Sequence, residues 1–242
     1  MDEQNKNLIL ATALSFAVIL VWFLLFPPPE ADPALEPGTE TSQTIEGTSV
    51  PASTADTGPQ GVTPYQLIQS VRHYLPEDSV VALDNGMYKL WFARYYPAFK
   101  PHNILLDNAL ASMGAGLPSA MAAKLMFPEK TVMAVCGDGG FLMNSQSLET
   151  AVRLQLNLTA IILNDGALGM IRWKQESEKQ PHFGLNFQNP DFIQLAQSYG
   201  ATGHRVHNIQ ELNTHFQKHP HPQRGVHVIE VAIDYQDNQT EF

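Results

Sequence analysis

Short apolar runs recur along the chain from residue 80 onward, and polar turns follow them. The runs cover residues 80–83, 132–136, 158–163 and 226–233, and the first three lead into turns rich in Gly, Asp and Asn. Continuous apolar runs of this length are typical of strands that are buried on both faces of a parallel sheet. The pattern therefore predicts four such strands.

Stretches with helical character separate these runs. They cover residues 118–126, 146–156, 191–199 and 210–218, and in the second stretch large apolar residues recur every four positions. Strands that alternate with helices predict an α/β fold with a doubly wound parallel sheet. Ligands of such sheets bind beyond the carboxyl ends of the strands, which is where the polar turns are expected.

A longer apolar stretch, residues 8–26, precedes this pattern. Its 19 residues carry no charge, and a helix of that length spans about 28 Å, close to the thickness of the bilayer core. A cleaved signal peptide is the alternative. It is disfavoured because Asp2 and Glu3 stand where such a peptide is basic, and because three Pro follow where cleavage needs small residues. We expect one N-terminal transmembrane anchor over residues 1–29.

The segment between the two patterns, residues 30–61, has a different composition. It is rich in Pro, Thr, Ser, Gly and acidic residues, and it contains no Lys or Arg. Such a segment cannot bury enough apolar surface to order itself. We therefore expect a disordered, flexible linker, followed by one globular domain over residues 62–242.

Charge and metal-binding residue types narrow the possible functions. The formal net charge is −10, so we expect no nucleic acid partner, since phosphate binding depends on Lys and Arg. Cys136 is the one cysteine, which excludes an internal disulfide and a zinc cluster of cysteines. His215, His219 and His221 could form a metal site; a solvated helix end and loop is the interpretation that we favour.

Two of the polar turns together form a motif with chemical meaning. Residues 137–140 read Gly-Asp-Gly-Gly, and Asp165 follows Asp138 by 27 positions, in the turn after the next strand. Glycines let backbone N–H groups approach a phosphate, and two carboxylates at neighbouring strand ends can bind Mg²⁺. Gly-Asp-Gly alone is also a common turn. The paired Asn164-Asp165-Gly166 at this distance favours the cofactor-binding interpretation.

This pair of turns resembles the thiamine diphosphate (ThDP) binding motif, and the resemblance extends over about 180 residues. Residues 84–86, 90–96, 112–118, 137–154, 168–171 and 189–192 are similar to the C-terminal domain of acetolactate synthase large chains. The resemblance implies ThDP and Mg²⁺ as cofactors. It also implies a 2-oxo acid, pyruvate, as substrate, in the branched-chain amino acid biosynthesis of that family.

The resemblance further assigns a role to individual residues. It implies that Asp138 and Asp165 bind Mg²⁺ through their side chains, and Ala167 through its carbonyl. The cofactor itself would contact the following residues: Gly86, Gly137, Gly139 and Gly140 near the diphosphate, Ala111 by its carbonyl, and Met113 as the wedge that bends it. Met170 and Ile171 would line the substrate side. Without the family, Met113, Met170 and Trp173 would be interpreted as core residues.

Two departures from the biosynthetic members of that family leave the exact substrate open. Residues 86–88 read Gly-Met-Tyr where those enzymes have Gly-Gln-His, and Trp173 stands one position closer to Met170. Another ThDP-dependent 2-oxo acid decarboxylase is therefore an alternative. A nicotinamide dehydrogenase is disfavoured, because no G-x-G-x-x-G follows the first strand.

In this family the glutamate that activates the cofactor lies in a separate pyrimidine domain. We expect this chain to bind ThDP and Mg²⁺ and to need a pyrimidine-domain partner for turnover. A catalytically silent, membrane-tethered module or a chimeric fragment is the other interpretation. If the family's dimer surface is uncovered here, apolar residues around Met113 and at 90–92 would be exposed and would favour self-association.

The first 31 residues, MDEQNKNLILATALSFAVILVWFLLFPPPEA, resemble the N-terminus of a YidC-type membrane insertase, with its first transmembrane helix only. The resemblance implies a single-pass protein of the bacterial inner membrane. Lys6 precedes the apolar stretch and no basic residue follows it until Arg72, which favours the N-terminus in the cytoplasm and the domain outside. ThDP chemistry favours the domain in the cytoplasm, so the side stays open.

Overall fold

A computed structural model describes residues 61–220 and 224–235 of the chain. The expected anchor, and the expected linker up to residue 60, lie outside these residues. Among the residues that are described, no helix combines the length and the apolar character needed to cross a membrane.

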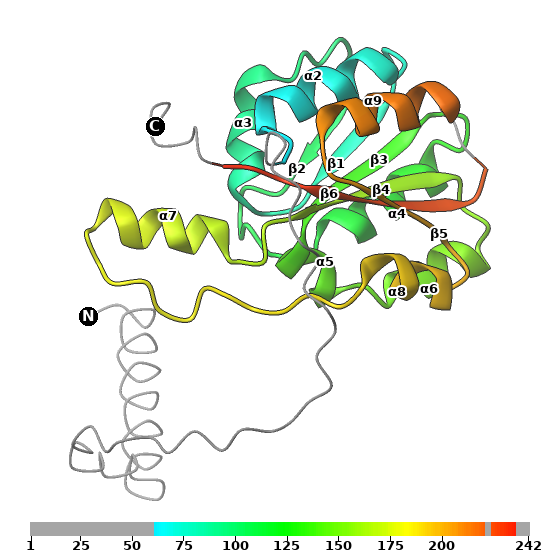
Figure 1. The fold of residues 1–242 in the computed structure, drawn as a ribbon. Coiled ribbons are helices and arrows are strands. Elements are labelled where there is room, and N and C mark those ends of the chain that lie inside the picture. Colours follow the sequence, from blue (N-terminus) through cyan, green and yellow to red (C-terminus); the bar gives the residue numbers. More distant parts are fainter. Residues whose placement is uncertain (1–60, 221–223, 236–242) are drawn as a thin grey trace, which may run out of the picture. The chain divides into compact units, whose positions relative to one another are not determined.

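The centre of the fold is a sheet of six strands (Figure 1). The strands are β1 (Val80–Leu83), β2 (Ile104–Leu106), β3 (Val132–Gly137), β4 (Leu158–Asn164), β5 (Thr202–Val206) and β6 (Val226–Ala232). Every neighbouring pair is parallel, and the order across the sheet is β2-β1-β3-β4-β6-β5. The predicted α/β fold with a parallel sheet is confirmed, and the four predicted strands are β1, β3, β4 and β6.

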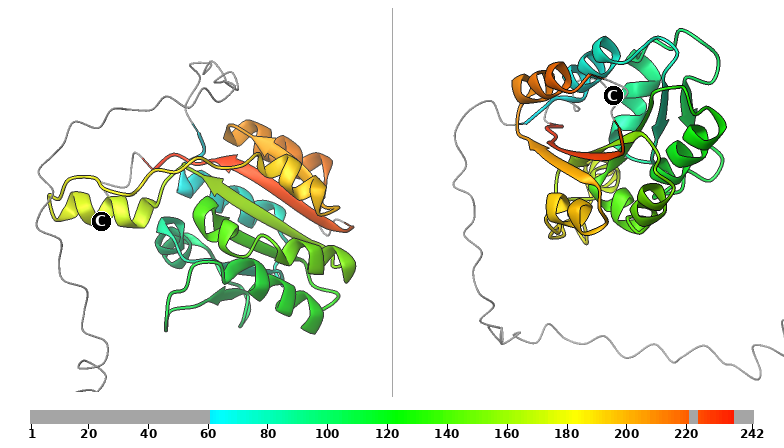
Figure 2. Two further views of the ribbon diagram at one scale, coloured as in Figure 1. Left: turned by 90° about the horizontal axis from the view of Figure 1, so that it is seen from below. Right: turned by 90° about the vertical axis from the view of Figure 1, so that its right-hand side faces the viewer.

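Helices cover both faces of the sheet, as the doubly wound prediction requires (Figures 1 and 2). One face carries α2 (Pro64–Tyr74), α3 (Met87–Tyr95) and α9 (Ile209–Lys218). The opposite face carries α4 (Gly116–Met126), α5 (Asp138–Met143), α6 (Ser147–Arg153) and α8 (Phe192–Ser198). The remaining helix, α7 (Gly169–Ser177), buries no residue and projects beyond the sheet.

Alternating residues of each strand supply the two hydrophobic cores. In β3, Met133 and Val135 pack under α2 and α3, whereas Ala134 and Cys136 pack under α4 and α5. Successive side chains of a strand point to opposite faces, so a strand that is covered on both sides must be apolar at every position. This explains why the four central strands were visible in the sequence as unbroken apolar runs.

One expected exposed patch is in fact part of the core. Trp91 and Phe92 are buried, at 3% and 0% exposure, in the cluster under α2 and α3. The prediction that residues 90–92 form an uncovered dimer surface is therefore wrong for these two side chains. They face inward because α3 packs against α2 and the sheet within the same domain.

The strand order reverses between β1 and β3, because β1 connects to β2 on one side and the chain then returns to the other. This reversal is the switch point where doubly wound sheets bind ligands. The turn after β1 contains Asp84 and Gly86, while Gly137 ends β3 and Asp138 begins α5 directly after it. The fold thus brings the predicted motif to the expected binding position.

Candidate functional site

A cavity of about 270 Å³ lies at the carboxyl ends of β1, β3 and β4. Its lining contains every residue for which the sequence predicted a contact with cofactor, metal or substrate: Gly86, Ala111, Met113, Gly137, Asp138, Gly139, Gly140, Asp165, Ala167, Met170 and Ile171. These residues come from four separate stretches of sequence. The structure therefore gathers the whole predicted set at one site.

Asp138 is the most firmly held carboxylate of the cavity. Its Oδ1 accepts from the N–H of Gly139 at 2.8 Å, and its Oδ2 accepts from the N–H of Gly166 at 2.8 Å and from Nδ2 of Asn189 at 2.7 Å. The side chain is buried, at 2% exposure. Burial raises the pKa of this carboxyl, and the hydrogen bonds oppose the shift. Its orientation is fixed before any ligand binds.

Asp165 lies in the next turn and is held less completely. Its Oδ2 is buried and has no hydrogen-bond partner among the described residues. Burial first, and then the charge of Asp138, raise the pKa of this carboxyl to about 6. A buried anionic oxygen without a donor is costly unless a cation or a proton neutralises it. This oxygen is the strongest indication of a cation at the site.

The residues present fit a hard divalent cation. Mg²⁺ prefers carboxylate and carbonyl oxygens, together with phosphate and water, and Asp138, Asp165 and Ala167 line the cavity. No group of three or more His, Cys, Asp or Glu side chains among the described residues could hold a metal ion. The remaining ligands of a cation here would therefore be carbonyl, phosphate or water oxygens.

The glycines of the site allow close packing as well as ligand approach. A Cβ atom at Gly140 would lie 2.5 Å from Oδ2 of Asp84, and one at Gly116 would lie 2.7 Å from Cβ of the same residue. A Cβ at Gly139 would lie between 3.2 and 3.4 Å from the side chains of Leu168, Phe187 and Met113. Gly140 is thus required by its contact with Asp84, a reason that the motif alone did not reveal.

Asp84 positions the loop that contains Ala111 and Met113. Its Oδ1 accepts from the N–H groups of Asn85, Gly114 and Ala115 at 2.7, 2.8 and 3.2 Å, and its Oδ2 accepts from Gly114 at 3.0 Å. Ala111 has a φ of 49°, a strained value for a residue with a side chain. The sequence placed Asp84 at a strand end, but its bonds to a loop 30 residues away could not be read from it.

Two tyrosines, the buried Tyr88 and the partly buried Tyr235, line a side of the cavity that sequence reasoning missed. The hydroxyl of Tyr88 accepts from the N–H of Gly137 at 2.9 Å, and Tyr235 also lines the cavity. Burial raises the pKa of both hydroxyls well above the usual value, so both stay protonated. No local pattern marks either residue, since Tyr88 reaches the end of β3 from α3 and Tyr235 reaches the cavity from the segment after β6.

The open side of the cavity lies at the start of α7. Met170 and Ile171 line it there, and Ile171 is 45% exposed. Because α7 buries no residue, Met170 and Trp173 are not core residues. Their interpretation as core residues is therefore wrong. Both residues lie on the part of the chain that projects from the sheet.

The expected solvated helix end holds for His219, which is exposed at the end of α9, but not for His215. His215 is buried, and its ring centroid lies 4.4 Å from that of His204 and 4.7 Å from that of His219. The clustering arises because β5 packs against α9. No metal-binding group is found among the described histidines, and His221 lies outside the described residues.

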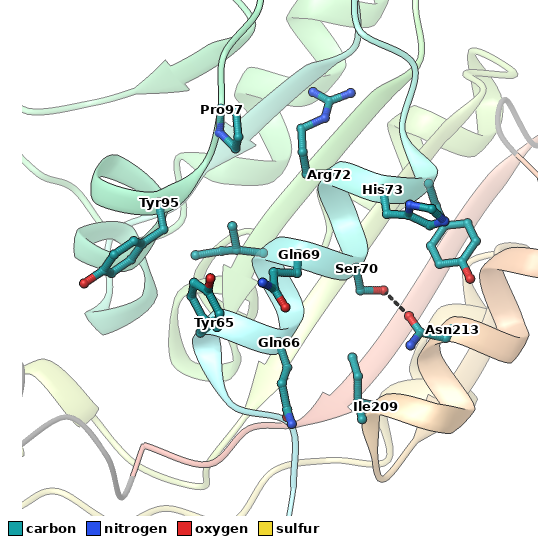
Figure 3. Close-up of a pocket in the computed structure, with 12 residues that line it drawn as sticks. Tyr65, Gln66, Gln69, Ser70, Arg72, His73, Tyr95, Pro97, Ile209 and Asn213 are labelled. Carbon is teal, nitrogen blue, oxygen red and sulfur yellow. Dashed lines mark hydrogen bonds between the residues drawn. The ribbon is translucent and has the colours of Figure 1, made fainter.

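A second cavity, of about 690 Å³, lies between α2, the end of α3 and α9 (Figure 3). Tyr65 and Tyr95 form one side of it in an edge-to-face contact, and Oγ of Ser70 donates to Oδ1 of Asn213 at 2.7 Å. Its lining contains no carboxylate and no glycine. This cavity therefore lacks the groups that distinguish the one at the strand ends.

Comparison with known proteins supports the importance of the strand-end cavity. Residues 84–231 match the family described as "Thiamine pyrophosphate enzyme, C-terminal TPP binding domain". The match begins at Asp84 and includes both Asp138 and Asp165. The sequence-based resemblance to a ThDP-binding domain is confirmed at this level.

Several curated proteins are similar to the chain. Acetolactate synthase of Bacillus subtilis is 32% identical over 193 residues, which are 80% of this chain and 33% of that protein. The putative thiamine pyrophosphate-containing protein YdaP of the same species is 37% identical over 70% of this chain and 29% of its own length. The chain thus spans about a third of the length of these relatives.

A solved structure has the same fold. It is the thiamine diphosphate-dependent 4-hydroxybenzoylformate decarboxylase of Rhodococcus jostii RHA1, with a TM-score of 0.69 and 26% identity. The likeness covers 76% of this chain and 34% of that one.

Proposed function

Because the chain belongs to the family of thiamine pyrophosphate enzymes, through their C-terminal TPP binding domain, we propose that residues 62–242 bind ThDP with Mg²⁺ in the cavity at the ends of β1, β3 and β4. The observation that supports this most directly is the buried Oδ2 of Asp165. It has no donor among the described residues and lies in the same cavity as the fixed carboxylate of Asp138. A cation would neutralise both groups.

Each residue of the cavity then has a defined task. Asp138, Asp165 and the carbonyl of Ala167 would hold the cation, whose charge would neutralise the diphosphate. Gly137, Gly139 and Gly140 allow the diphosphate to approach the backbone, with Gly86 nearby. The cofactor, when bound, supplies the carbanion chemistry, and the protein supplies its binding and orientation.

The loop above the cavity would fix the shape of the cofactor. Met113 would lie under the bend of ThDP, and the carbonyl of Ala111 would accept a hydrogen bond from its amino group. Support for this comes from Asp84, whose bonds to Gly114 and Ala115 hold the loop next to both residues. The strained backbone of Ala111 is consistent with a carbonyl that is held in one direction.

We propose an acetolactate-synthase-like reaction, in which two pyruvates condense to 2-acetolactate with loss of CO₂. The support is the name of several relatives and the position of Met170 and Ile171 at the open side of the cavity. The activating glutamate is supplied from a pyrimidine domain, so that this domain alone is silent. Pyruvate turnover by the purified chain without such a domain would contradict the second part of the proposal.

Decarboxylation of another 2-oxo acid is the second candidate. It is favoured by the fold likeness to a 4-hydroxybenzoylformate decarboxylase and by Tyr88, whose hydroxyl accepts from the N–H of Gly137. Biosynthetic synthases have a different stretch at this position. The two candidates are separated by supplying pyruvate or an aryl 2-oxo acid to the chain in the presence of a pyrimidine domain and detecting acetolactate or aldehyde.

Titration calorimetry of ThDP into the full chain tests the binding proposal. We expect binding with Mg²⁺ present, loss of binding with EDTA, and loss of binding in Asp138→Asn. Glu149→Gln is the matched control, because it neutralises an exposed carboxylate of α6 that pairs with Arg153 and Thr150 and lies outside the cavity. Absence of binding by the unchanged protein at millimolar ThDP and Mg²⁺ would refute the proposal.

The membrane anchor and the bacterial inner-membrane location are proposed from the sequence of residues 1–29. Fractionation of source cells, with mass spectrometry of the membrane fraction, tests them. We expect a peptide that joins residues 30–61 to residues 62–72 in that fraction. Peptides of a separate insertase and a separate full-length synthase, without the joining peptide, would show a chimera instead.

A further inference from the structure

Asn189 joins the ends of two neighbouring strands at the proposed cation site. It lies in the segment before α8, and its Nδ2 donates to Oδ2 of Asp138 at 2.7 Å and to Oδ1 of Asn164 at 2.9 Å. Both amide hydrogens are therefore used, one at the end of β3 and the other at the end of β4. Asn189 is 51 residues from Asp138 in sequence, so this contact depends on the fold.

The contact with Asn189 decides which part of Asp138 is available to a cation. A carboxylate has about four acceptor directions. Oδ2 accepts from Gly166 and Asn189, and Oδ1 accepts from Gly139. Of the two oxygens, Oδ1 therefore accepts fewer of these hydrogen bonds and is the more open to a cation. Without Asn189 the carboxylate could rotate more freely. Cation binding would then have to fix an orientation that the protein otherwise supplies.

Asn189 is itself held by a chain of polar contacts that extends across three strands. Nδ2 of Asn164 donates to Oε1 of Glu230 at 2.8 Å, and Oε2 of Glu230 accepts from Nε of Arg205 at 2.8 Å. Glu230 is buried and Arg205 balances its charge. A buried carboxylate that is paired in this way keeps one position, because an unpaired alternative is costly.

The chain of contacts returns to its starting point. Nη2 of Arg205 donates to Oδ1 of Asp191 at 3.1 Å, and Asp191 caps α8 by accepting from the N–H groups of Ile193 and Gln194. Asp191 is two residues from Asn189, so side-chain contacts and two peptide bonds close a ring. The segment is fixed at both of its polar residues.

We propose that Asn189 is a positioning residue of the cation site, and that the Glu230–Arg205 pair fixes Asn189. This rests on the proposed function, since it concerns the same cation. Asn189 holds Asp138 so that Oδ1 faces the cation. The Oδ1 atom of Asn189 is buried and has no partner among the described residues. A water on the cation, of the kind that Mg²⁺ usually keeps, would supply the missing donor.

A Mn²⁺-binding measurement tests the proposal without an activity assay. Mn²⁺ is titrated into the chain at saturating ThDP, and the electron paramagnetic resonance signal of the free ion gives the fraction that is bound. Loss of a residue that orients a metal ligand typically weakens metal binding 10–100-fold. We expect a weakening of this size in Asn189→Ala. We expect a smaller weakening in Glu230→Gln, which keeps an acceptor for Asn164 but loses the charge that pairs with Arg205.

Asn213→Ala is the matched control, because it removes one asparagine hydrogen bond, to Ser70, in the other cavity. If Asn189→Ala does not fold, Asn189→Leu keeps the volume without the donors, and Glu230→Gln leaves Asn189 in place. Tight Mn²⁺ binding by the unchanged chain and by the Asn189 variant alike would overturn the inference. Failure of the unchanged chain to bind ThDP would instead refute the proposed function.

Discussion

Two carboxylates at the carboxyl ends of strands, Asp84 after β1 and Asp165 after β4, have the same sequence signal and opposite surroundings. Each directly follows the last residue of its strand, and burial raises the pKa of each carboxyl. At Asp84 backbone N–H groups satisfy the carboxylate and oppose the shift. At Asp165 the next cause is the like charge of Asp138, and Oδ2 has no donor among the described residues.

The difference separates a structural carboxylate from a binding one. The oxygens of Asp84 have their hydrogen-bond donors within the protein, and they hold the loop that contains Ala111 and Met113. Oδ2 of Asp165 has no donor among the described residues, and a buried oxygen that is left without a donor indicates a ligand. Hydrogen-bond accounting distinguishes two residues that a motif search would treat alike. Three predictions, ordered by expected effect, test this comparison.

Replacement of Asp84 should have the largest effect on stability. Asp84→Ala leaves the N–H groups of Gly114 and Ala115 without their acceptor in a buried position. Because each unsatisfied buried donor costs roughly 1–3 kcal/mol, we expect a loss of about 4 kcal/mol in the free energy of unfolding. Urea denaturation without metal measures it. An unchanged midpoint would show that Asp84 is dispensable to the loop.

Asp165 should make the metal-free protein less stable as the pH rises. Its folded pKa of about 6 lies above its ordinary value of 3.8, so the folded state binds the proton more tightly. The resulting stabilisation is complete below pH 4 and is lost as the pH rises through 6. With allowance for solvent screening, we expect a loss of about 2 kcal/mol.

Urea denaturation of Asp165→Asn at pH 4 and pH 7 isolates this contribution. The variant should be the more stable protein at pH 7, and the difference should disappear at pH 4. Mg²⁺ with ThDP should reverse the order at pH 7, because only the unchanged protein has both carboxylates. A constant difference between the two proteins at every pH would contradict the assignment of this pKa.

Tyr88 should contribute least, because it satisfies a single backbone group. Tyr88→Phe removes the acceptor for the N–H of Gly137 and keeps the ring. We expect a loss of about 1 kcal/mol in the free energy of unfolding. The change in ThDP affinity should be smaller than the change caused by Asp165→Asn. Calorimetry gives both values. A larger effect on affinity than on stability would place the hydroxyl among the cofactor contacts.

Sequence could predict the central strands of the fold and not its edges. Strands β1, β3, β4 and β6 are apolar throughout because helices cover both of their faces. Strand β2 has three half-buried residues, and β5 buries only Val206. An edge strand needs fewer apolar residues, so neither pattern differed from that of a loop.

The same limit applies to the site. Local motifs supplied the glycines and the two carboxylates, since these residues are fixed by strand ends and spacing. Residues that act through the fold were missed: Tyr88 and Tyr235 line the cavity, and Asn189 bonds to Asp138, although all three are distant from the motif in sequence. Their roles depend on tertiary contacts, such as the 51-residue separation of Asn189 and Asp138, which no periodicity encodes.

The alkylation rate of Cys136, the one cysteine of the chain, would report how often this region opens. Its sulfur is fully buried at the end of β3, directly before Gly137, and burial raises the pKa of the thiol well above its usual value. A thiol reagent attacks the thiolate and needs access, so alkylation proceeds only when the core around β3 opens. The alkylation rate therefore measures the frequency of opening. Any ligand that stabilises the closed state of the neighbouring cavity lowers this rate, and the decrease grows with the fraction of the protein that is bound.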